Sequence, residues 1–296
     1  MSQDPIGPTR RRHHGRAVTK KVRIDAPPQA IWEAWAKPQE IARWFVDRAE
    51  GEMAEGATVT WIFERFGYRL PIEVYDSVPG EYLAFGGELP GRPPALQEVL
   101  IRREGGTTVL RLVNSGFLEG ADWDEELEGV DSGWSQALAV LKLYLERYRG
   151  RDRAHHLALR PAGAFPYEKV VPLYTTRAGL ESWLADSAHL ASEPLAVGGA
   201  VRLDFGDGLA LDGEVLARSA WELLLSWPEL DGVLGLKAFR FGGDRAVALA
   251  LSAWPPPGPL AKDWQVTEGI MERATGRLAE RLSDGAREDG QSSVGG

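Results

Sequence analysis

The sequence predicts an α+β protein of two similar domains, each a curved antiparallel sheet closed by a long C-terminal helix. Three observations lead to this prediction. Short segments of alternating apolar residues follow one another about every ten residues in the first half, with no helical stretch between them. An amphipathic stretch at 134–148 comes after the last of them. The same order of elements then returns in the second half of the chain.

The composition excludes several classes of protein. The chain has 296 residues, of which 44% are hydrophobic, so two ordinary domain cores can be buried. Because it has no cysteine, disulfides, thiolate catalysis and cysteine-bound metals are excluded. The formal net charge of −9 argues against a nucleic-acid partner. No apolar run reaches the roughly 18 residues that span a bilayer. We therefore expect a cytoplasmic protein without a membrane span.

Changes in composition predict where the domains begin and end. The first residues contain prolines and a basic run but no apolar core of a secretory signal, and they are typical of a flexible tail. A short basic arm for nucleic acid or anionic lipid is the alternative. The expected boundaries are a tail at 1–16, a first domain at 17–149, a linker at 150–163, a second domain at 164–284 and a flexible tail at 285–296.

Each expected element of the first domain follows from its pattern of apolar residues. Within each strand the apolar residues share a parity, so they should face one side of the sheet. Ala26-Pro27-Pro28 ends the first strand, since proline cannot continue a strand ladder but suits a helix start. The elements are strands at 18–24, 58–64, 72–74, 82–85, 99–101 and 110–112, short helices at 31–35 and 38–45, an acidic loop at 119–131 and the closing helix at 134–148.

The second half echoes the first at nearly constant offsets. Leu180 to Leu184 repeats the pattern of Ile41 to Phe45, and the offset is 139 residues. Val201, Leu203 and Phe205 repeat Val59, Trp61 and Phe63 at 142, and Gly213 to Leu216 repeats Ile72 to Tyr75 at 141. Val247 to Leu251 then stands for Val109 to Val113, and a closing helix is expected at 266–282. We interpret the halves as diverged copies of one domain.

The first half resembles a known family through three groups of residues. At the start these are Ala26-Pro27, Ile31-Trp32, Ala34-Trp35, Pro38, Ile41 and Trp44-Phe45. In the middle they run from Glu73-Val74 to Glu81-Tyr82-Leu83-Ala84-Phe85. At the end they are Thr107 to Leu112, Ser115-Gly116-Phe117, Gly133 to Leu138 and Leu141 to Leu145. Residues 17–148 are in this way similar to the activator-of-heat-shock-protein-90-ATPase-like branch of the START/polyketide-cyclase superfamily, often called SRPBCC.

The resemblance carries expectations about fold and function. It implies the helix-grip (START-like) fold in each half, with a cavity between sheet and helix that the superfamily uses for apolar ligands. It also implies that a chaperone-regulating role is one option. The second half matches less well, because Glu214-Val215-Leu216 to Trp227 fits the middle stretch whereas Glu268-Gly269-Ile270 replaces the Gly-Trp entry to the last helix.

The sequence offers no arrangement of residues suited to catalysis. His13, His14, His155 and His156 fall in the expected tail and linker, and His189 stands alone, so neither a general base nor a histidine zinc site is expected. The acidic segment 119–131 has the carboxylates for a hard cation but not the spacing of an EF-hand, so a solvated loop is expected. Glu73 and Glu214, at equivalent places in the two halves, should point outward because their neighbours are apolar. We expect no catalytic residue, no cofactor and no metal.

Three hypotheses for function remain. The first is a non-catalytic protein that holds a small apolar or aromatic molecule between the sheet and the closing helix. The second is a protein-interaction module, with a chaperone as one candidate partner and the acidic segment as a docking surface for a basic protein. The third is an enzyme of the cyclase or aromatase type. For the first, the expected cavity wall is Trp61, Phe63, Ile72, Val74, Leu83, Phe85, Val99, Ile101, Leu110, Leu112, Trp134, Leu138 and Leu141.

Overall fold

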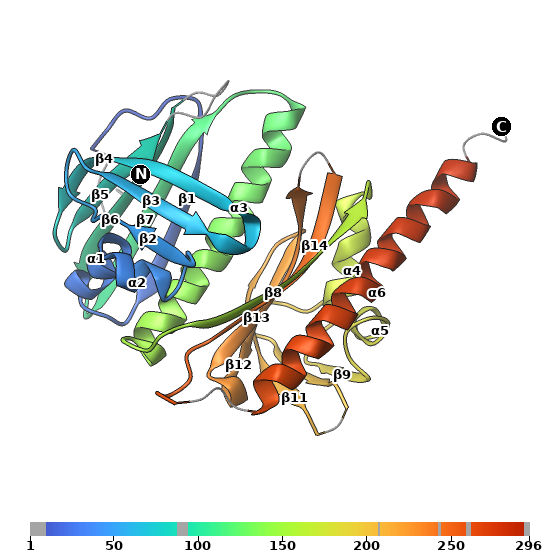
Figure 1. Ribbon diagram of the computed structural model, residues 1–296. Coiled ribbons are helices and arrows are strands. Elements are labelled where there is room, and N and C mark those ends of the chain that lie inside the picture. Colours follow the sequence, from blue (N-terminus) through green and yellow to red (C-terminus); the bar gives the residue numbers. More distant parts are fainter. Residues whose placement is uncertain (1–9, 88–93, 207, 242–243, 259–261, 293–296) are drawn as a thin grey trace. The chain divides into compact units, whose positions relative to one another are not determined.

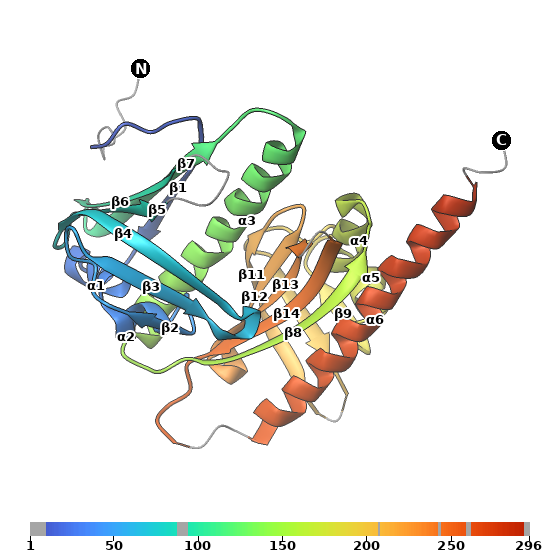
Figure 2. The same cartoon turned by 45° about the horizontal axis from the view of Figure 1, so that its top comes forward.

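The computed structural model describes residues 10–87, 94–206, 208–241, 244–258 and 262–292 of the chain (Figure 1). Contacts within the chain divide it into two compact units, Met1–Arg151 and Asp152–Gly296. Each unit contains a 7-stranded antiparallel sheet followed by a long helix (Figure 2). The α+β fold class, with two sheets each closed by a helix, is therefore confirmed. In the described part of the chain, no helix combines the length and apolar character needed to cross a membrane.

The first unit follows the predicted order of elements. It consists of β1 (Arg16–Ile24), α1 (Pro28–Ala36), α2 (Pro38–Ala42), β2 (Arg48–Glu50), β3 (Thr58–Phe63), β4 (Tyr68–Val78), β5 (Tyr82–Gly87), β6 (Ala95–Glu104), β7 (Thr107–Phe117) and α3 (Ala121–Leu143), which continues as a π-helical turn over Tyr144–Tyr148. The strand order is β1-β7-β6-β5-β4-β3-β2, so β2 to β7 form a meander and β1 pairs with the last strand. The short edge strand β2 was not predicted.

The second unit repeats this order. It consists of β8 (Ala154–Gly163), α4 (Val170–Thr175), α5 (Arg177–Glu181), β9 (Ser187–Leu190), β10 (Ala200–Asp204), β11 (Ala210–Arg218), β12 (Glu222–Trp227), β13 (Gly232–Phe241), β14 (Asp244–Ala253) and α6 (Lys262–Ser292). Its strand order, β8-β14-β13-β12-β11-β10-β9, is that of the first sheet. Helix α6 buries Trp264, Met271 and Leu278 in a core with the sheet.

Local irregularities recur at equivalent places in the two units. Ile72 pairs with Val59 across β3 and β4, as Gly213 pairs with Val201 across β10 and β11. The ladder between β4 and β5 shifts register after Val74, and the ladder between β11 and β12 shifts after Val215. A bulge is a specific backbone feature that bends a strand, and its repetition is not required by the composition of either strand. This repetition supports the duplication inferred from the sequence.

An indole hydrogen bond is also repeated. Trp44 Nε1 donates to the carbonyl oxygen of Ala34 over 2.8 Å, and Trp183 Nε1 donates to that of Leu173 over 3.1 Å. Each bond joins the end of one short helix to the preceding short helix. These tryptophans occupy the same position in the two matching segments, Ile41 to Phe45 and Leu180 to Leu184, so the internal bond of the short helix pair is repeated along with the sequence pattern.

The segment expected as a linker, 150–163, is largely a strand. Residues Ala154–Gly163 form β8, which pairs antiparallel with β14 from Ala253 to Arg245. The linker prediction is therefore wrong from residue 154 onward. The polar residues and the proline of this segment favoured a linker in the sequence. They are compatible with a strand here because β8 lies at the edge of its sheet, where a proline such as Pro161 is tolerated.

The acidic segment predicted as a loop forms the first turns of α3. Helix α3 begins at Ala121, just after Gly120, whose positive φ of 118° turns the chain. Negative side chains near a helix N-terminus complement the helix dipole, so the acidic composition favours the helix instead of opposing it. Two of its carboxylates are paired with strand β1, Asp124 with Arg16 and Asp131 with Lys20 over 2.6 Å. In the described part of the chain, no three His, Asp or Glu side chains lie close enough together to hold a metal ion.

The two predicted tails also differ from expectation. Residues 1–9 lie outside the described part, but residues 10–16 pack against the first sheet. For example, Gly116 N donates to the His14 carbonyl oxygen, and a side chain on Gly15 would meet the Phe117 carbonyl oxygen at 2.4 Å. At the other end, α6 continues through most of the expected tail 285–296, to Ser292. A helix satisfies its own backbone hydrogen bonds, so a polar segment without proline can extend it.

Candidate functional site

All thirteen predicted wall residues lie where the sequence placed them, on the strands and helix of the first unit. Ten of them come in pairs from β3, β4, β5, β6 and β7, and three come from α3. Each is less than 9% exposed except Phe63, which is partly buried. The outward orientation predicted for the two glutamates is confirmed, since Glu73 and Glu214 are both exposed next to buried apolar residues. The inner face of the sheet and the apolar side of α3 therefore meet in one buried apolar region, the aromatic space, and the role of these residues as the wall of a ligand cavity stays a prediction.

Aromatic rings occupy the centre of this space. Trp35 of α1 contacts Phe85 and Trp134, with ring centroids 6.0 and 5.7 Å apart. Phe45, just after α2, stacks on Trp134 at 5.4 Å and meets Trp61 edge-on at 5.3 Å. The sequence prediction contained Trp61, Phe85 and Trp134 but not Trp35 or Phe45, because it considered only the strands and the closing helix. The two short helices thus contribute part of the wall.

Two indole groups in this cluster have no hydrogen-bond partner. Trp35 Nε1 and Trp61 Nε1 are buried, and neither donates to any group of the described residues. Their neighbour Trp44 shows the usual arrangement, with its Nε1 bonded to the Ala34 carbonyl oxygen. A buried donor without an acceptor costs about 1–3 kcal/mol, so native structures rarely keep one without a reason. An acceptor atom brought into this space would remove that cost.

A polar pair lies beside the aromatic rings. Gln97 of β6 is the direct strand partner of Phe85 on one side and of Asn114 on the other. Its Nε2 donates to Asn114 Oδ1 over 2.8 Å, and Asn114 is only 6% exposed. Gln97 shares the inward parity of Val99 and Ile101, and this parity was the signal that sequence reasoning overlooked. The apolar space is therefore supplied with a small number of polar groups, as ligand sites usually are.

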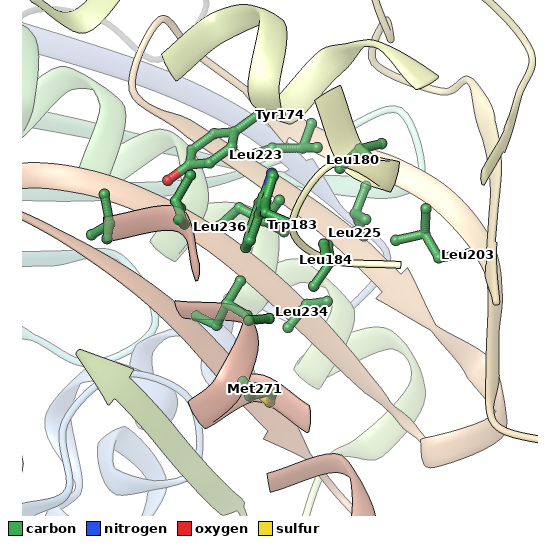
Figure 3. Close-up of a cluster of buried hydrophobic side chains, with 14 of the residues drawn as sticks. Tyr174, Leu180, Trp183, Leu184, Leu203, Leu223, Leu225, Leu234, Leu236 and Met271 are labelled. Atoms are coloured by element: carbon green, nitrogen blue, oxygen red, sulfur yellow. The ribbon is translucent and has the colours of Figure 1, made fainter. Parts of the chain in front are cut away.

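The second unit fills the equivalent space with aliphatic side chains. Strand pairing places Leu234 and Leu251 where the first unit has Gln97 and Asn114, and Leu225 where it has Phe85. Figure 3 shows leucines from several strands gathered around Trp183, with Met271 of α6 nearby. The polar pair of the first unit is thus replaced by two leucines at these positions of the second.

Two buried tyrosines, one in each unit, are held in their neutral form. Burial, followed by the contact with Glu40, raises the pKa of Tyr144 to about 12. Its hydroxyl donates to Glu40 Oε2 over 2.7 Å and so ties α2 to the end of α3. Burial also raises the pKa of Tyr174 well above its usual range, and its hydroxyl donates to the Lys237 carbonyl oxygen. These groups serve as structural hydrogen-bond donors.

His13, expected in a flexible tail, is fixed to a buried carboxylate. Its Nε2 hydrogen-bonds to Oε2 of Glu98, which is 0% exposed, and its Nδ1 lies 2.7 Å from Ser115 Oγ. The Tyr82 hydroxyl donates to Glu98 Oε1, and burial together with this carboxylate raises the pKa of Tyr82. Glu98 stands between Gln97 and Val99 on β6, so it faces the opposite side of the sheet from the aromatic space. The His13–Glu98 pair therefore cannot act on a ligand held there.

The remaining histidines are also placed. His155 and His156, expected in the linker, lie on β8, where His155 Nδ1 is 2.8 Å from the Leu251 carbonyl oxygen and His156 Nε2 is 3.1 Å from Glu272 of α6. His189 is exposed on β9. None of these three belongs to the apolar space of the first unit.

The chain is similar to several solved structures at low sequence identity. No curated protein matches the chain. Among solved structures, the dynemicin-locus protein DynU16 is 19% identical and covers 91% of this chain and 98% of its own, with a TM-score of 0.41. The di-domain ARO/CYC protein BexL is 13% identical and covers 90% and 98%, with a TM-score of 0.40. Protein MLL2253 from Mesorhizobium loti is 24% identical and covers 45% and 99%, with a TM-score of 0.41.

A family model matches most of the first unit. Residues 25–146 match the family described as activator of Hsp90 ATPase homolog 1-like protein. The matched range runs from the turn before α1 to the end of the closing helix, and so includes every wall residue of the aromatic space. The motifs and the strand order of the first unit agree with this match, so residues 25–146 are similar to the activator of Hsp90 ATPase homolog 1-like family.

Proposed function

We propose that the first unit binds a small, largely apolar or aromatic molecule that carries a hydrogen-bond acceptor, in the space between its sheet and α3. The observation that carries this proposal is the pair of buried, unpartnered indole N–H groups of Trp35 and Trp61. A ligand carbonyl or ether oxygen would accept from one of them. The remaining walls are apolar, so they favour a ligand body of rings or chains.

Entry of such a molecule requires a ring to move. The aromatic side chains contact one another, and Phe45 and Phe63 are the two that are partly exposed. Phe45 follows α2 and is not part of a strand, so it can rotate outward without breaking the sheet. The ligand then takes the place of the Phe45 ring against Trp134 and Trp61.

The residues around the aromatic space favour ligand binding over catalysis as its function. The thirteen wall residues, together with Trp35, Phe45, Gln97 and Asn114, include no acid or base. General acid–base chemistry needs a titratable side chain within hydrogen-bond reach of the reacting atom. A protein-docking role for the acidic segment is also less favoured, because Asp124 and Asp131 are paired with cations of β1.

The experiment uses two molecules that differ by one acceptor, the bicyclic ketone 1-tetralone and the hydrocarbon tetralin. We expect both to raise the melting temperature of the full chain, because any ligand of the folded state stabilises it. The ketone should bind roughly three- to tenfold more tightly, as one added hydrogen bond predicts. Trp61→Phe, tested with Trp35→Phe, should abolish this preference.

Trp44→Phe is the matched control, because the Trp44 indole is already bonded within the protein. It should lower stability but leave the ratio of the two affinities unchanged. The proposal is refuted if neither molecule binds, or if the native protein binds ketone and hydrocarbon equally. Mass spectrometry of the recovered ketone completes the test, since a chemically altered ligand would favour the cyclase or aromatase hypothesis.

A further inference from the structure

A groove of about 1020 Å³ opens on the first unit, and Ile101 is the one predicted wall residue of the aromatic space that also lines it. It lies where three segments meet, namely the turn before α1 with Pro27 and Pro28, the turn between β4 and β5 with Pro79, and strand β6. Arg10, from the segment expected to be a tail, forms a further part of its lining. The volume is that of sites for small organic molecules.

The charge of the groove is opposite to that of the protein. The residues that line it include three arginines, Arg10, Arg102 and Arg103, and one acidic residue, Glu81. The chain as a whole has a formal net charge of −9. A cationic groove on an acidic protein attracts anions locally, and guanidinium groups bind phosphate and carboxylate oxygens through paired N–H donors. We propose that this groove binds a small, multiply charged anion whose charges are phosphate or carboxylate groups.

Arg10 is held at the groove by its own backbone. The N–H groups of Arg10 and Arg11 donate to Glu98 Oε1 over 3.0 and 3.1 Å, and the Arg10 guanidinium lies 4.4 Å from the centre of the Tyr82 ring. Since Glu98 is completely buried, this anchor is fixed to the sheet. The arginine is therefore positioned before an anion arrives, which lowers the entropy cost of binding.

Arg11 provides a contrast one residue along the chain. Its guanidinium donates to the Tyr75 carbonyl oxygen over 2.7 Å and lies 5.3 Å from the Tyr75 ring, and it does not line the groove. Arg10 in turn lies 3.4 Å from Glu81 in an exposed ion pair. An incoming anion must compete with that carboxylate for Arg10. Removal of the Arg10 charge should therefore weaken anion binding, whereas removal of the Glu81 charge should strengthen it.

The test measures binding of inorganic pyrophosphate and of citrate to the full chain by calorimetry at constant ionic strength, because salt screens such contacts. We expect saturable binding of at least one anion, with pyrophosphate and citrate distinguishing a phosphate from a carboxylate ligand. Arg10→Gln and Arg103→Gln should each raise its Kd about tenfold. Glu81→Gln should lower the Kd, and Arg11→Gln should change it less than about twofold.

Three results would overturn the proposal. One is the absence of saturable binding of both anions in the millimolar range. Another is an equal loss of affinity in the Arg10 and Arg11 variants, which would indicate attraction to overall charge alone. The third is unchanged affinity in Arg10→Gln and Arg103→Gln while their melting temperatures match the native protein. The outcome is independent of ligand binding in the aromatic space, since the variants lie outside it.

Discussion

Glu98 is the centre of a hydrogen-bond cluster on the first sheet that the sequence did not predict. Its two oxygens accept from Tyr82, from His13 and from the backbone of Arg10 and Arg11. This cluster could not be predicted from local patterns, because His13 lies 85 residues before Glu98 and neither residue stands out within its own segment. A single buried carboxylate thereby converts an expected tail into an ordered part of the domain.

Replacing Glu98 tests this arrangement at the scale of one residue. Glu98→Gln keeps the shape but puts an amide donor where a carboxylate oxygen accepted hydrogen bonds, so at least one donor of the cluster loses its acceptor. We expect the free energy of unfolding to fall by roughly 1–3 kcal/mol, measured by urea denaturation. Glu73→Gln, at an exposed site, should change it by less than about 0.5 kcal/mol. Equal values for the two variants would show that the cluster contributes nothing to stability.

At the scale of elements, neighbouring strands approach so closely at some positions that only glycine fits there. Gly86 of β5 lies so near β6 that an added Cβ would be 1.9 Å from the Ala95 carbonyl oxygen. Gly133 in α3 is different, since an added Cβ there meets nothing within 4 Å. Gly86 lies just beyond the predicted strand 82–85, and Gly133 is part of the motif that resembles the known family. The sequence alone does not show that a side chain would clash at Gly86 but fit at Gly133.

The two glycines should respond oppositely to alanine. Gly86→Ala should destabilise the first unit by at least about 1–3 kcal/mol, because the strand must shift to relieve the clash. Gly133→Ala should stabilise it by roughly 0.5–1 kcal/mol, because alanine favours the helix over the unfolded chain. Thermal unfolding followed by circular dichroism measures both. A neutral Gly86→Ala would contradict the backbone approach between β5 and β6.

At the scale of the whole molecule, one architecture is used twice with different interiors. The two sheets share strand order, ladder register and bulge position. The first interior has aromatic rings, free indole donors and the Gln97–Asn114 pair, whereas the second has leucines at the corresponding strand positions. We infer that duplication preserved the packing of the fold, and that a ligand function belongs to the first copy.

Each unit should also fold alone. A fragment of residues 1–151 contains a complete sheet and its closing helix, so we expect a cooperative thermal transition and a dispersed amide NMR spectrum. A fragment of residues 1–118 lacks α3 and exposes the apolar face that covers Trp134, Leu138 and Leu141, so it should fail to fold. Extension to residue 163 should add no stability, because β8 pairs with β14. A disordered 1–151 fragment would contradict the division into units.

The sequence by itself determined the fold class, the duplication and the inward residues of the first sheet. These depend on periodicity, which is a local property: alternation fixes the face of a strand residue, and spacing of three and four fixes the face of a helix. The buried face of the first sheet and of its closing helix was predicted in this way, and the role of its thirteen residues as a ligand-cavity wall stays a prediction.

Only the tertiary structure decided which polar groups are paired. Glu98 finds its partners in the N-terminal segment, β8 finds its partner strand 82 or more residues along the chain, and the indole donors of Trp35 and Trp61 find none among the described residues. Hydrogen bonds and close contacts between distant segments depend on the folded path of the chain. Local residue patterns do not determine that path. The groove lined by Arg10 and the indole donors without an acceptor could therefore be identified only from the tertiary structure.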